Sequence, residues 1–411
     1  MIPTRPASPK TRTPQLGREA FRALRYRNFR LLFTGTVLSQ TGDFLQIMAQ
    51  GWLVLVLTGS PLSLGVIGFC QAVPRLALGV LAGMLADRFE RRRLLFLSQA
   101  GMMAQSIVYA FLVATHRITY PQIIVLTLVW GSLNAINQTA RSSLIPALVP
   151  REEMLNAIAI HSSAFNLTRT LGPALGGGLV GLLGVAGCLW INAASFVPLL
   201  WALAAMQFPP RTPAERSSRA GFGEALRFVR GERDVLVAIT LTYIVAFFAL
   251  PYSRLLPLFA RDVFHSGPGA YGLLMAAAGV GAVASTLALA AFGRAERLAR
   301  LLPLVTLLLG VSLVGFVCAP NLGVGIGVLV AFGALQLGLR TVAATLIQSS
   351  TPDALRGRVT GIFLMDIGVW SIGTVVIAAL AEGVGVRWGV GIGAGLCVLA
   401  GAAAVRTERA R

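Results

Sequence analysis

The stretch "GMLADRFERRR", residues 83 to 93, places six charged residues among eleven in a chain of 411 residues of which only 12% are charged. Long apolar runs precede and follow it. A short, strongly charged segment between two apolar runs is typical of a loop that joins two membrane-spanning helices, because charges are costly to place in the bilayer. The stretch therefore predicts a membrane fold. It leaves open whether these charges only fix the orientation of the helices in the membrane or also have a functional role.

The composition of the whole chain agrees with a polytopic membrane protein. Hydrophobic residues make up 55% and there are 45 glycines, which is too apolar and too rich in glycine for an ordinary soluble protein. The first thirty residues are polar and basic, unlike a signal peptide, so we expect the first membrane helix to direct insertion. The cysteines stand singly in apolar runs and predict neither a disulfide framework nor a metal site: Cys70, Cys188, Cys318 and Cys397.

Twelve apolar runs are long enough to span a bilayer, which takes roughly 20 residues. We place them at 29–57, 62–86, 94–115, 121–148, 155–183, 185–207, 235–258, 270–292, 301–319, 322–347, 359–381 and 388–405.

The longest interior polar stretch divides these runs into two sets of six, as a pair of repeats around a central site would require. Within this stretch, Phe222, Leu226 and Val229 recur at helical spacing and predict a helix lying in the membrane interface. The predicted organisation is an N-terminal tail (1–28), a first half (29–207), a linker (208–234), a second half (235–405) and a C-terminal tail (406–411).

The basic residues predict the orientation, because loops rich in arginine and lysine stay in the cytoplasm. If the N-terminus is inside, 27 of the 35 basic residues fall in the tails and cytoplasmic loops, and only Arg117, Arg261 and Arg387 fall in outer loops. We therefore expect both termini in the cytoplasm, and a bacterial plasma (inner) membrane location. The net charge of +19 does not predict nucleic-acid binding, since it is spread over seven separate segments beside the membrane.

Charged residues inside the runs are expected to have a partner, a wet cavity or a function, because each costs roughly 2.5 to 3.5 kcal/mol at mid-depth. Counting along the helices places Asp43 near mid-depth with Arg75 or Arg169 nearby, and a separate pair, Arg340 with Asp366, closer to the cytoplasm. All five are candidates for proton coupling. Asp43 is the foremost of them, because a carboxyl group whose partner comes and goes can load and release a proton. The alternative is a static ion pair.

Two polar stripes predict a water-filled cavity between the first and fourth helices. The alternative is that their amides only bond neighbouring helices. With Arg254, the candidate cavity residues are Gln40, Gln46, Gln50, Asn134, Asn137, Gln138 and Arg141. His161, near the start of the fifth helix, is either a proton relay or a solvated helix-end residue.

These motifs together resemble the major facilitator superfamily over about residues 20 to 405. Gly83, Leu85, Asp87, Arg88, Arg91 and Arg92 match its signature between helices 2 and 3, although Glu90 stands where the common form has glycine. "LGPALGG", residues 171 to 177, is similar to the fifth-helix motif of drug:proton antiporters through Gly172, Pro173, Gly176 and Gly177. The segment that begins "ARSSLIPALVPREEML" resembles the branch that holds the enterobactin exporter and macrolide-efflux proteins.

The resemblance implies an all-α fold of twelve transmembrane helices in two six-helix halves. It also implies a conformational latch formed by Gly83, Asp87, Arg88, Arg91 and Arg92, in which Asp87 faces the start of helix 11 and the arginines brace adjacent helices. An overlapping "GGGLVG" at 176–181 fits a dinucleotide-binding pattern, but inside a membrane run it predicts close helix packing instead.

We expect a monomeric secondary transporter, and more narrowly an exporter that exchanges an amphipathic small molecule, such as a siderophore or a drug, for protons. No cofactor or enzymatic activity is expected, since there is no P-loop and no nucleophile with a base. Five intramembrane arginines against two aspartates favour an anionic or catecholate-like cargo. The alternatives are a uniporter or lipid-moving protein that does not use protons, and a membrane sensor or scaffold that binds without transport.

Overall fold

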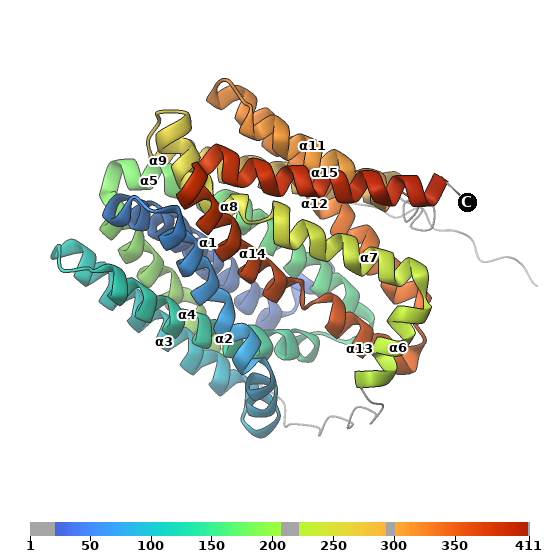
Figure 1. Cartoon of the computed structure of the whole chain (residues 1–411). Helices are drawn as coiled ribbons and strands as arrows, with labels where there is room; N and C mark the ends of the chain where they lie inside the picture. Colours follow the sequence, from blue (N-terminus) through green and yellow to red (C-terminus); the bar gives the residue numbers. More distant parts are fainter. Residues whose placement is uncertain (1–20, 207–221, 293–300, 410–411) are drawn as a thin grey trace, which may run out of the picture.

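The computed structural model describes residues 21–206, 222–292 and 301–409, with the side chains of 80–84, 86–88, 146, 222, 290–292 and 409 left out. The predicted helix of the linker is present, at 222–231. In Figure 1 the first half (blue to green) and the second half (yellow to red) lie beside each other as two bundles of helices.

The first half is built from five long helices. They are α1 (Arg27–Thr58), α2 (Pro61–Arg88), α3 (Arg91–Ala114), α4 (Tyr120–Leu144) and α5 (Met154–Ala205), with short 3₁₀ turns at Arg22–Arg25, Ile145–Leu148 and Arg151–Glu153. Within α5 the backbone turns at Gly184, where φ is +69°, a value that glycine adopts without steric cost. The two segments on either side of Gly184 are therefore the predicted fifth and sixth spans.

The second half contains more interruptions. After α6 (Phe222–Gly231), its seventh span is made of α7 (Arg233–Ile244), a π-helical turn (Val245–Ala249), α8 (Tyr252–Leu258) and a second π-helical turn (Phe259–Val263). The remaining helices are α9 (Pro268–Phe292), α11 (Leu302–Val317), α12 (Leu322–Ser350), α13 (Asp353–Phe363), α14 (Asp366–Val384) and α15 (Val386–Arg409).

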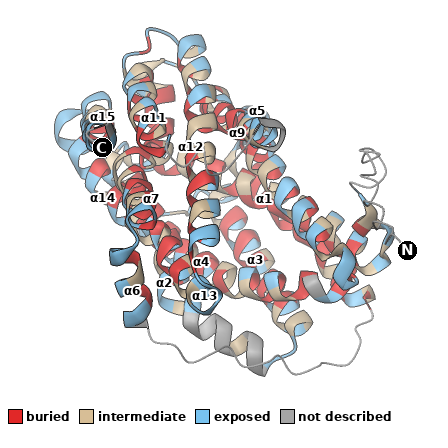
Figure 2. Cartoon of the chain, turned by 90° about the vertical axis from the view of Figure 1, so that its right-hand side faces the viewer, coloured by how far each residue is buried: buried red, intermediate tan, exposed pale blue. Residues whose placement is uncertain are grey.

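The described helices account for the twelve predicted spans. Nine helical stretches are long and apolar enough to cross a membrane. One of these nine turns back at Gly184, α11 is a shorter apolar helix, and α1 is long but rich in polar side chains. Large apolar side chains on the outer surface are exposed, for example Leu155, Leu182 and Trp201, as lipid contact requires. Figure 2 shows buried residues concentrated where helices face one another.

Two ends of the bundle can be distinguished. At the termini end, α1 begins, α15 ends, and α2 is joined to α3. The opposite end holds the α1–α2, α3–α4, α11–α12 and α14–α15 connections.

The halves contact each other through α5 with α9 and α2 with α14. A Cβ atom built on Gly272 of α9 would lie 2.6 Å from the carbonyl oxygen of Pro173 in α5, so the two backbones touch. Hydrogen bonds that cross from one half to the other include those from Ser60 and Leu62 to Glu382 and from Arg261 to Leu55. These bonds hold the two halves together at the opposite end, which they keep closed.

Two features differ from the sequence-based expectation. The eleventh span is broken at Leu364 and Met365 into α13 and α14, whereas one continuous run was predicted. The linker helix α6 forms as predicted, and it also packs its buried Ala225 and Val229 against α13 and α7 of the second half, a contact that the sequence did not predict. Small and β-branched residues on this face allow close contact with another helix. The spacing of hydrophobic residues alone does not show whether such a face contacts another helix or lipid.

Candidate functional site

The first candidate cluster surrounds Asp43, which α1 places inside the first half. Its carboxylate Oδ1 accepts a hydrogen bond from the indole Nε1 of Trp130 on α4 at 3.3 Å. Arg141, three turns further along α4, is 2% exposed and lies close enough to attract the carboxylate electrostatically. Within the described residues no direct ion pair joins Asp43 to Arg141, and the Arg141 Nε has no hydrogen-bond partner.

This arrangement corrects the expected partner of Asp43. The charge near Asp43 comes from Arg141, not from Arg75 or Arg169. Arg75 is exposed on α2 and interacts with Asp366 and Arg340 of the second half. Arg169 on α5 interacts with Tyr252 and Arg340. Position along a helix can be counted from the sequence, but the direction in which each side chain points around the helix depends on how the helices are rotated in the bundle.

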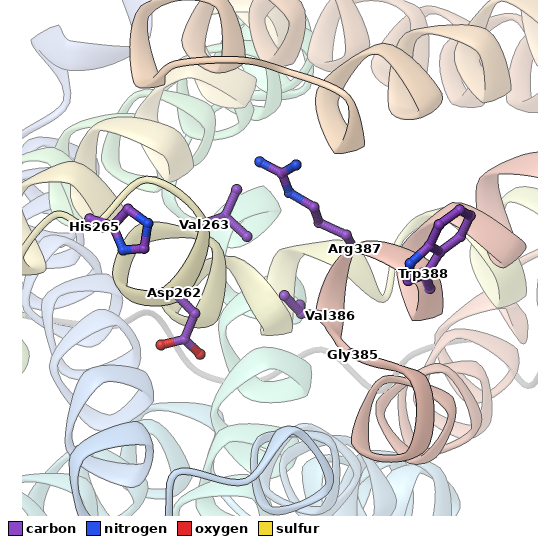
Figure 3. A pocket seen from close by; sticks show the side chains of 7 residues that line it. All are labelled: Asp262, Val263, His265, Gly385, Val386, Arg387 and Trp388. Atoms are coloured by element: carbon purple, nitrogen blue, oxygen red, sulfur yellow. The ribbon is translucent and has the colours of Figure 1, made fainter.

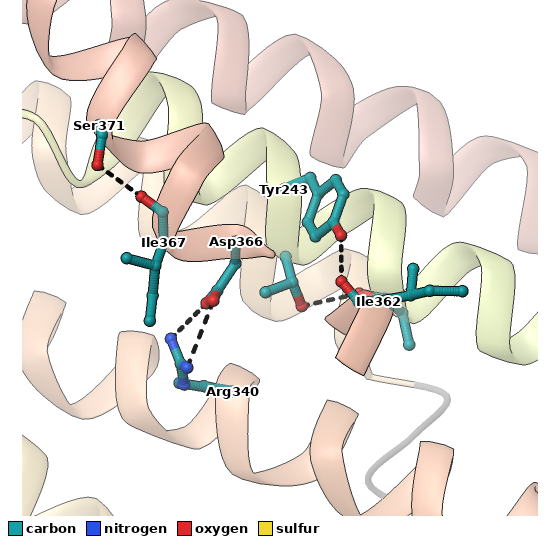
Figure 4. A network of polar contacts seen from close by, with 8 residues as sticks. Tyr243, Arg340, Ile362, Asp366, Ile367 and Ser371 are labelled. Carbon is teal, nitrogen blue, oxygen red and sulfur yellow. Dashed lines mark hydrogen bonds and ion pairs between the residues drawn. The ribbon is translucent and has the colours of Figure 1, made fainter. Parts of the chain in front are cut away.

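The second cluster centres on Asp366, and it contains the predicted pair with Arg340. The Arg340 Nη1 donates a short hydrogen bond to Oδ2 of Asp366, and its Nη2 lies 3.5 Å from Oδ1 (Figure 4). Asp366 is the first residue of α14, and its carboxylate also accepts the backbone N–H of Ile367. The Arg340 guanidinium lies 5.7 Å from the centre of the Phe363 ring. Since Arg75 of α2 also acts on Asp366, this carboxylate connects charges of both halves.

The break in the eleventh span lies beside this pair. Without a continuous helix, the Ile362 carbonyl loses its usual partner four residues later and accepts the backbone N–H of Met365 at 3.1 Å instead. The Tyr243 hydroxyl of α7 donates a second, short hydrogen bond to the same carbonyl (Figure 4), which ties α7 to the break.

The amide side chains of the predicted stripes are mostly bonded within the first half. Gln50 Nε2 donates to the Thr127 hydroxyl at 2.6 Å, and the Asn192 amide donates to Gln46 Oε1 at 2.8 Å. Asn137 Nδ2 donates to the Ser98 hydroxyl at 3.3 Å. Of the remaining candidates, Gln40 is buried, Asn134 is half-buried and Gln138 is exposed. Gln46, Gln50 and Asn137 thus follow the alternative in which amides join neighbouring helices, and the water-filled cavity between α1 and α4 stays a prediction.

A small enclosed pocket of about 10 Å³ lies between the two halves, room for about one water molecule. Arg254 reaches it from α8, and its guanidinium lies 5.4 Å from the centre of the Trp370 ring. The sequence pointed to Arg254 and Gln50 but missed the other polar side chains here. The pocket is lined by Ile47, Gln50, Gly51, Leu64, Ile67, Gln71, Arg254 and Tyr271.

The fifth-helix motif serves close packing. A Cβ atom on Gly172 would lie 2.5 Å from the Cβ of Phe44 on α1, and Gly176 faces Leu45 and Met48 of the same helix. Gly177 meets the backbone of α9. The motif, including Pro173 whose carbonyl abuts α9, lets α5 touch both halves.

Of the five latch residues, Gly83, Asp87 and Arg88 lie where the structure describes only the helical backbone. Arg91 Nη1 donates to the Ser143 carbonyl at 2.8 Å, and Arg92 donates to the Leu203 and Ala204 carbonyls at 2.7 and 2.9 Å. These carbonyls belong to the last turns of α4 and α5, where free acceptors and the negative end of the helix dipole favour a cation. The two arginines therefore brace adjacent helices, as the resemblance implied.

A larger open pocket of about 410 Å³ lies at the opposite end (Figure 3). Its walls come from the segment before α9 and from the α14–α15 turn. The lining residues are Asp262, Val263, His265, Gly385, Val386, Arg387 and Trp388. Asp262 is already paired with Arg261 at 2.5 Å. Within the described residues no group of three His, Cys, Asp or Glu side chains could hold a metal ion.

Comparison with known proteins places this geometry in a family. Residues 18–410 match the family model described as "Transmembrane secretion effector". The chain is 23% identical over 362 residues to the staphyloferrin A transporter of Staphylococcus aureus, covering 86% of this chain and 89% of the relative. It is 24% identical over 372 residues to the multidrug efflux pump Tap of Mycolicibacterium fortuitum, covering 87% and 90%.

The solved structures agree on the fold. A bacterial homologue of the human lysosomal transporter Spinster, in an inward-facing and occupied conformation, superposes with a TM-score of 0.73 at 13% identity, covering 93% of this chain and 97% of that one. The family match, which spans nearly the whole chain, and the twelve spans in two halves lead to one conclusion. The chain belongs to the major facilitator superfamily of membrane transporters, in its family of transmembrane secretion effectors.

Proposed function

We propose that this protein is a proton-coupled exporter that moves an amphipathic small molecule, such as a siderophore or a drug, by alternating access. The relatives support this cargo range, since one is named a staphyloferrin A transporter and another a multidrug efflux pump. The closed opposite end supports two-state access. With both termini in the cytoplasm, as the basic loops favour, the closed end is the extracytoplasmic one.

The observation that carries the coupling proposal is the buried Asp43 carboxylate without a direct ion pair. An isolated ionised carboxylate is costly to bury, so its environment favours proton uptake. Arg141 lies within electrostatic reach of Asp43, and coupling requires that α1 shifts against α4 until the two groups are in contact. Such a contact stabilises the carboxylate and releases the proton. Asp43 can thus hold a proton in one conformation and lose it in the other.

Asp366 is the proposed second coupling group, because its charge is shared between the halves. Rocking the halves changes the distance between Arg75 of α2 and the Arg340–Asp366 pair of the second half. The charge balance around Asp366 would therefore differ between conformations, and a change in the protonation of Asp366 would offset that difference.

The proposed cargo is anionic as well as amphipathic. Arg254 is stacked over Trp370 and faces the pocket between the halves that Gln71 and Tyr271 also line. Arg75 and Arg169 add positive charge near this interface. A guanidinium beside aromatic rings binds an acidic or catecholate group while the rings bind its apolar part.

The latch proposal for the cytoplasmic end rests on Asp87. A carboxylate at the N-terminus of another helix is worth up to about 1 kcal/mol when exposed and about 2 kcal/mol when partly buried. We expect Asp87→Asn to insert normally, because Arg88 and Arg91 to Arg93 still fix orientation, while transport falls. Full transport by this variant, with normal insertion, rules out the latch.

The function is tested in two stages. Small molecules in the medium of deletion and wild-type cells are compared first, and a compound lost from the medium and retained inside the deletion cells is the cargo. Purified protein in liposomes is then tested for proton movement that depends on this compound, using a pH-sensitive dye.

Asp43→Asn should abolish the coupled proton movement, whereas Glu408→Gln, at an exposed acid on α15, should not. Compound transport that ignores a collapsed proton gradient would contradict coupling. Binding without any transport would contradict the exporter itself.

A further inference from the structure

The Glu382 side chain, in the last turn of α14, crosses from the second half to the first residues of α2. Its Oε2 accepts a hydrogen bond from the Ser60 hydroxyl at 2.8 Å and another from the backbone N–H of Leu62 at 3.1 Å. One carboxylate oxygen thus bonds both the N-cap side chain and the backbone of a helix that belongs to the other half.

The first turn of α2 needs this acceptor. Helix N-termini have backbone N–H groups with no partner inside the helix. Pro61 has no N–H, and the N–H of Ser63 donates to the Ser60 hydroxyl oxygen at 3.2 Å. Leu64 N–H reaches the Ser60 carbonyl at 3.5 Å. Only Leu62 is left without an acceptor from its own helix, and Glu382 supplies that acceptor.

Glu382 is unfavourably placed with respect to its own helix. An acidic residue in the last turn faces the negative end of the helix dipole, where cations are favoured. The positive end of α2 compensates for this conflict only while the two helices stay together. A residue that violates a local rule and is compensated across an interface is a mark of a functional contact.

The surrounding packing shows that the contact belongs to the closed state. One turn further along α2, a Cβ atom built on Gly65 would lie 2.5 Å from the Cβ of Ala378, so α2 and α14 already touch. On the neighbouring pair of helices, Arg261 of the second half donates to the Leu55 carbonyl of α1 at 3.4 Å. Separating the halves at this end must break the Glu382 bonds first, because these groups lie at the helix ends.

We propose that Glu382 is a gating residue that holds the extracytoplasmic end closed by capping α2 across the two halves, and that it must release Ser60 and Leu62 before the transporter can face outward. The arrangement repeats, at the other end of the same helix pair, the carboxylate-to-helix contact expected for Asp87. This inference goes beyond the proposed function, since it depends neither on the cargo nor on the coupling ion.

The test measures how far the two halves separate at this end, in the protein alone without substrate or proton gradient. Cys318 is exposed at the end of α11, whereas the other three cysteines are buried, so it can carry a spin label without further change. Arg117→Cys, in the exposed α3–α4 connection, provides a second label on the first half. Pulsed electron spin resonance in lipid nanodiscs then gives the distribution of distances between them.

Two variants weaken the contact in different ways. Glu382→Gln keeps the acceptor atom but removes the charge, and Ser60→Asp keeps an N-cap for α2 but places two carboxylates together. Ser63→Ala is the matched control, because only the backbone N–H and carbonyl of Ser63 take part in bonds.

We expect the population with long distances to rise about two- to five-fold in Glu382→Gln, as for a helix-terminus charge at an exposed site, and by more in Ser60→Asp. Ser63→Ala should match the parent. Unchanged distances in both test variants, with melting temperatures that show folded protein, overturn the proposal. An equal rise in Ser63→Ala also overturns it, because the effect then comes from a general loosening of α2.

Discussion

The indole Nε1 of Trp130 donates a hydrogen bond to the Asp43 carboxylate at 3.3 Å, and this neutral donor takes the place that an arginine was expected to fill. A carboxyl group held by a neutral donor can be ionised or protonated without breaking an ion pair. The two residues therefore form a pair whose energetic coupling reports the charge on Asp43.

A double-mutant cycle with Trp130→Phe and Asp43→Asn should give a coupling of about 1 to 3 kcal/mol, since hydrogen bonds to a charged group are worth about 1.5 to 3 kcal/mol and neutral ones less. Thermal unfolding in detergent measures it. Trp201→Phe, at a lipid-exposed tryptophan, is the control and should leave stability nearly unchanged. Additive effects of the two test changes would show that the contact contributes nothing.

Replacing Arg340 alone should destabilise the protein more than replacing both Arg340 and Asp366. Arg340→Gln leaves the buried Asp366 carboxylate without its direct partner, and we expect a loss of about 1 to 3 kcal/mol, less than for a fully buried pair because the Arg340 side chain is 38% exposed. The double variant Arg340→Gln/Asp366→Asn should recover a large part of this loss. Melting temperatures of the three variants check the order, and a double variant less stable than Arg340→Gln contradicts it.

Two tyrosines give opposite expectations for the same change. Tyr243→Phe removes the hydroxyl that ties α7 to the Ile362 carbonyl at the end of α13, so we expect a loss of about 1 kcal/mol and faster backbone hydrogen exchange in residues 353–363. Tyr109→Phe removes a buried hydroxyl without a partner among the described residues, and it should be neutral or stabilising. Equal destabilisation by both changes would contradict a specific contribution of the Tyr243 hydrogen bond.

Gly272→Ala should prevent the close contact of α5 with α9. The added Cβ would lie 2.6 Å from the Pro173 carbonyl oxygen and 2.7 Å from the Gly177 Cα, and overpacking of this kind costs about 1 to 3 kcal/mol. The state in which the end opposite the termini is closed should become less populated, which labels on Cys318 and Arg117→Cys can detect. Gly178→Ala, where the added Cβ meets nothing within 4 Å, is the control. Identical distances in both variants would show that α9 can shift at no cost.

Much of the fold was predictable from the sequence because bilayer thickness sets the length of each span. The expected run at 29–57 corresponds to α1 at Arg27–Thr58, and the expected division between 183 and 185 falls at the Gly184 turn. The break at Leu364 was not predictable, because its apolar sequence continues across it. The interruption is stabilised by Tyr243, which lies more than a hundred residues earlier in the chain.

The charged residues of the candidate site could be identified from the sequence, but only some of the residues that contact them could be. The rarity of charge in an apolar chain identified Asp43, Arg141, Arg340 and Asp366 without any structure, and the pairing of Arg340 with Asp366 followed from their similar depth. Trp130, Tyr271 and Trp370 were missed, because aromatic residues in membrane helices are common and nothing in their spacing separates a functional ring from a lipid-facing one.

The sequence by itself determined that this protein is a twelve-span membrane transporter, since hydropathy, charge distribution and motifs are local properties that the bilayer turns directly into topology. Only the tertiary structure decided which charges meet. Asp43 contacts Trp130 and not Arg75, and Glu382 caps α2 across the halves, because such contacts depend on helix rotation and on the packing of segments up to 322 residues apart. Those packing relationships depend on the whole helix bundle, so no single stretch of the sequence determines them.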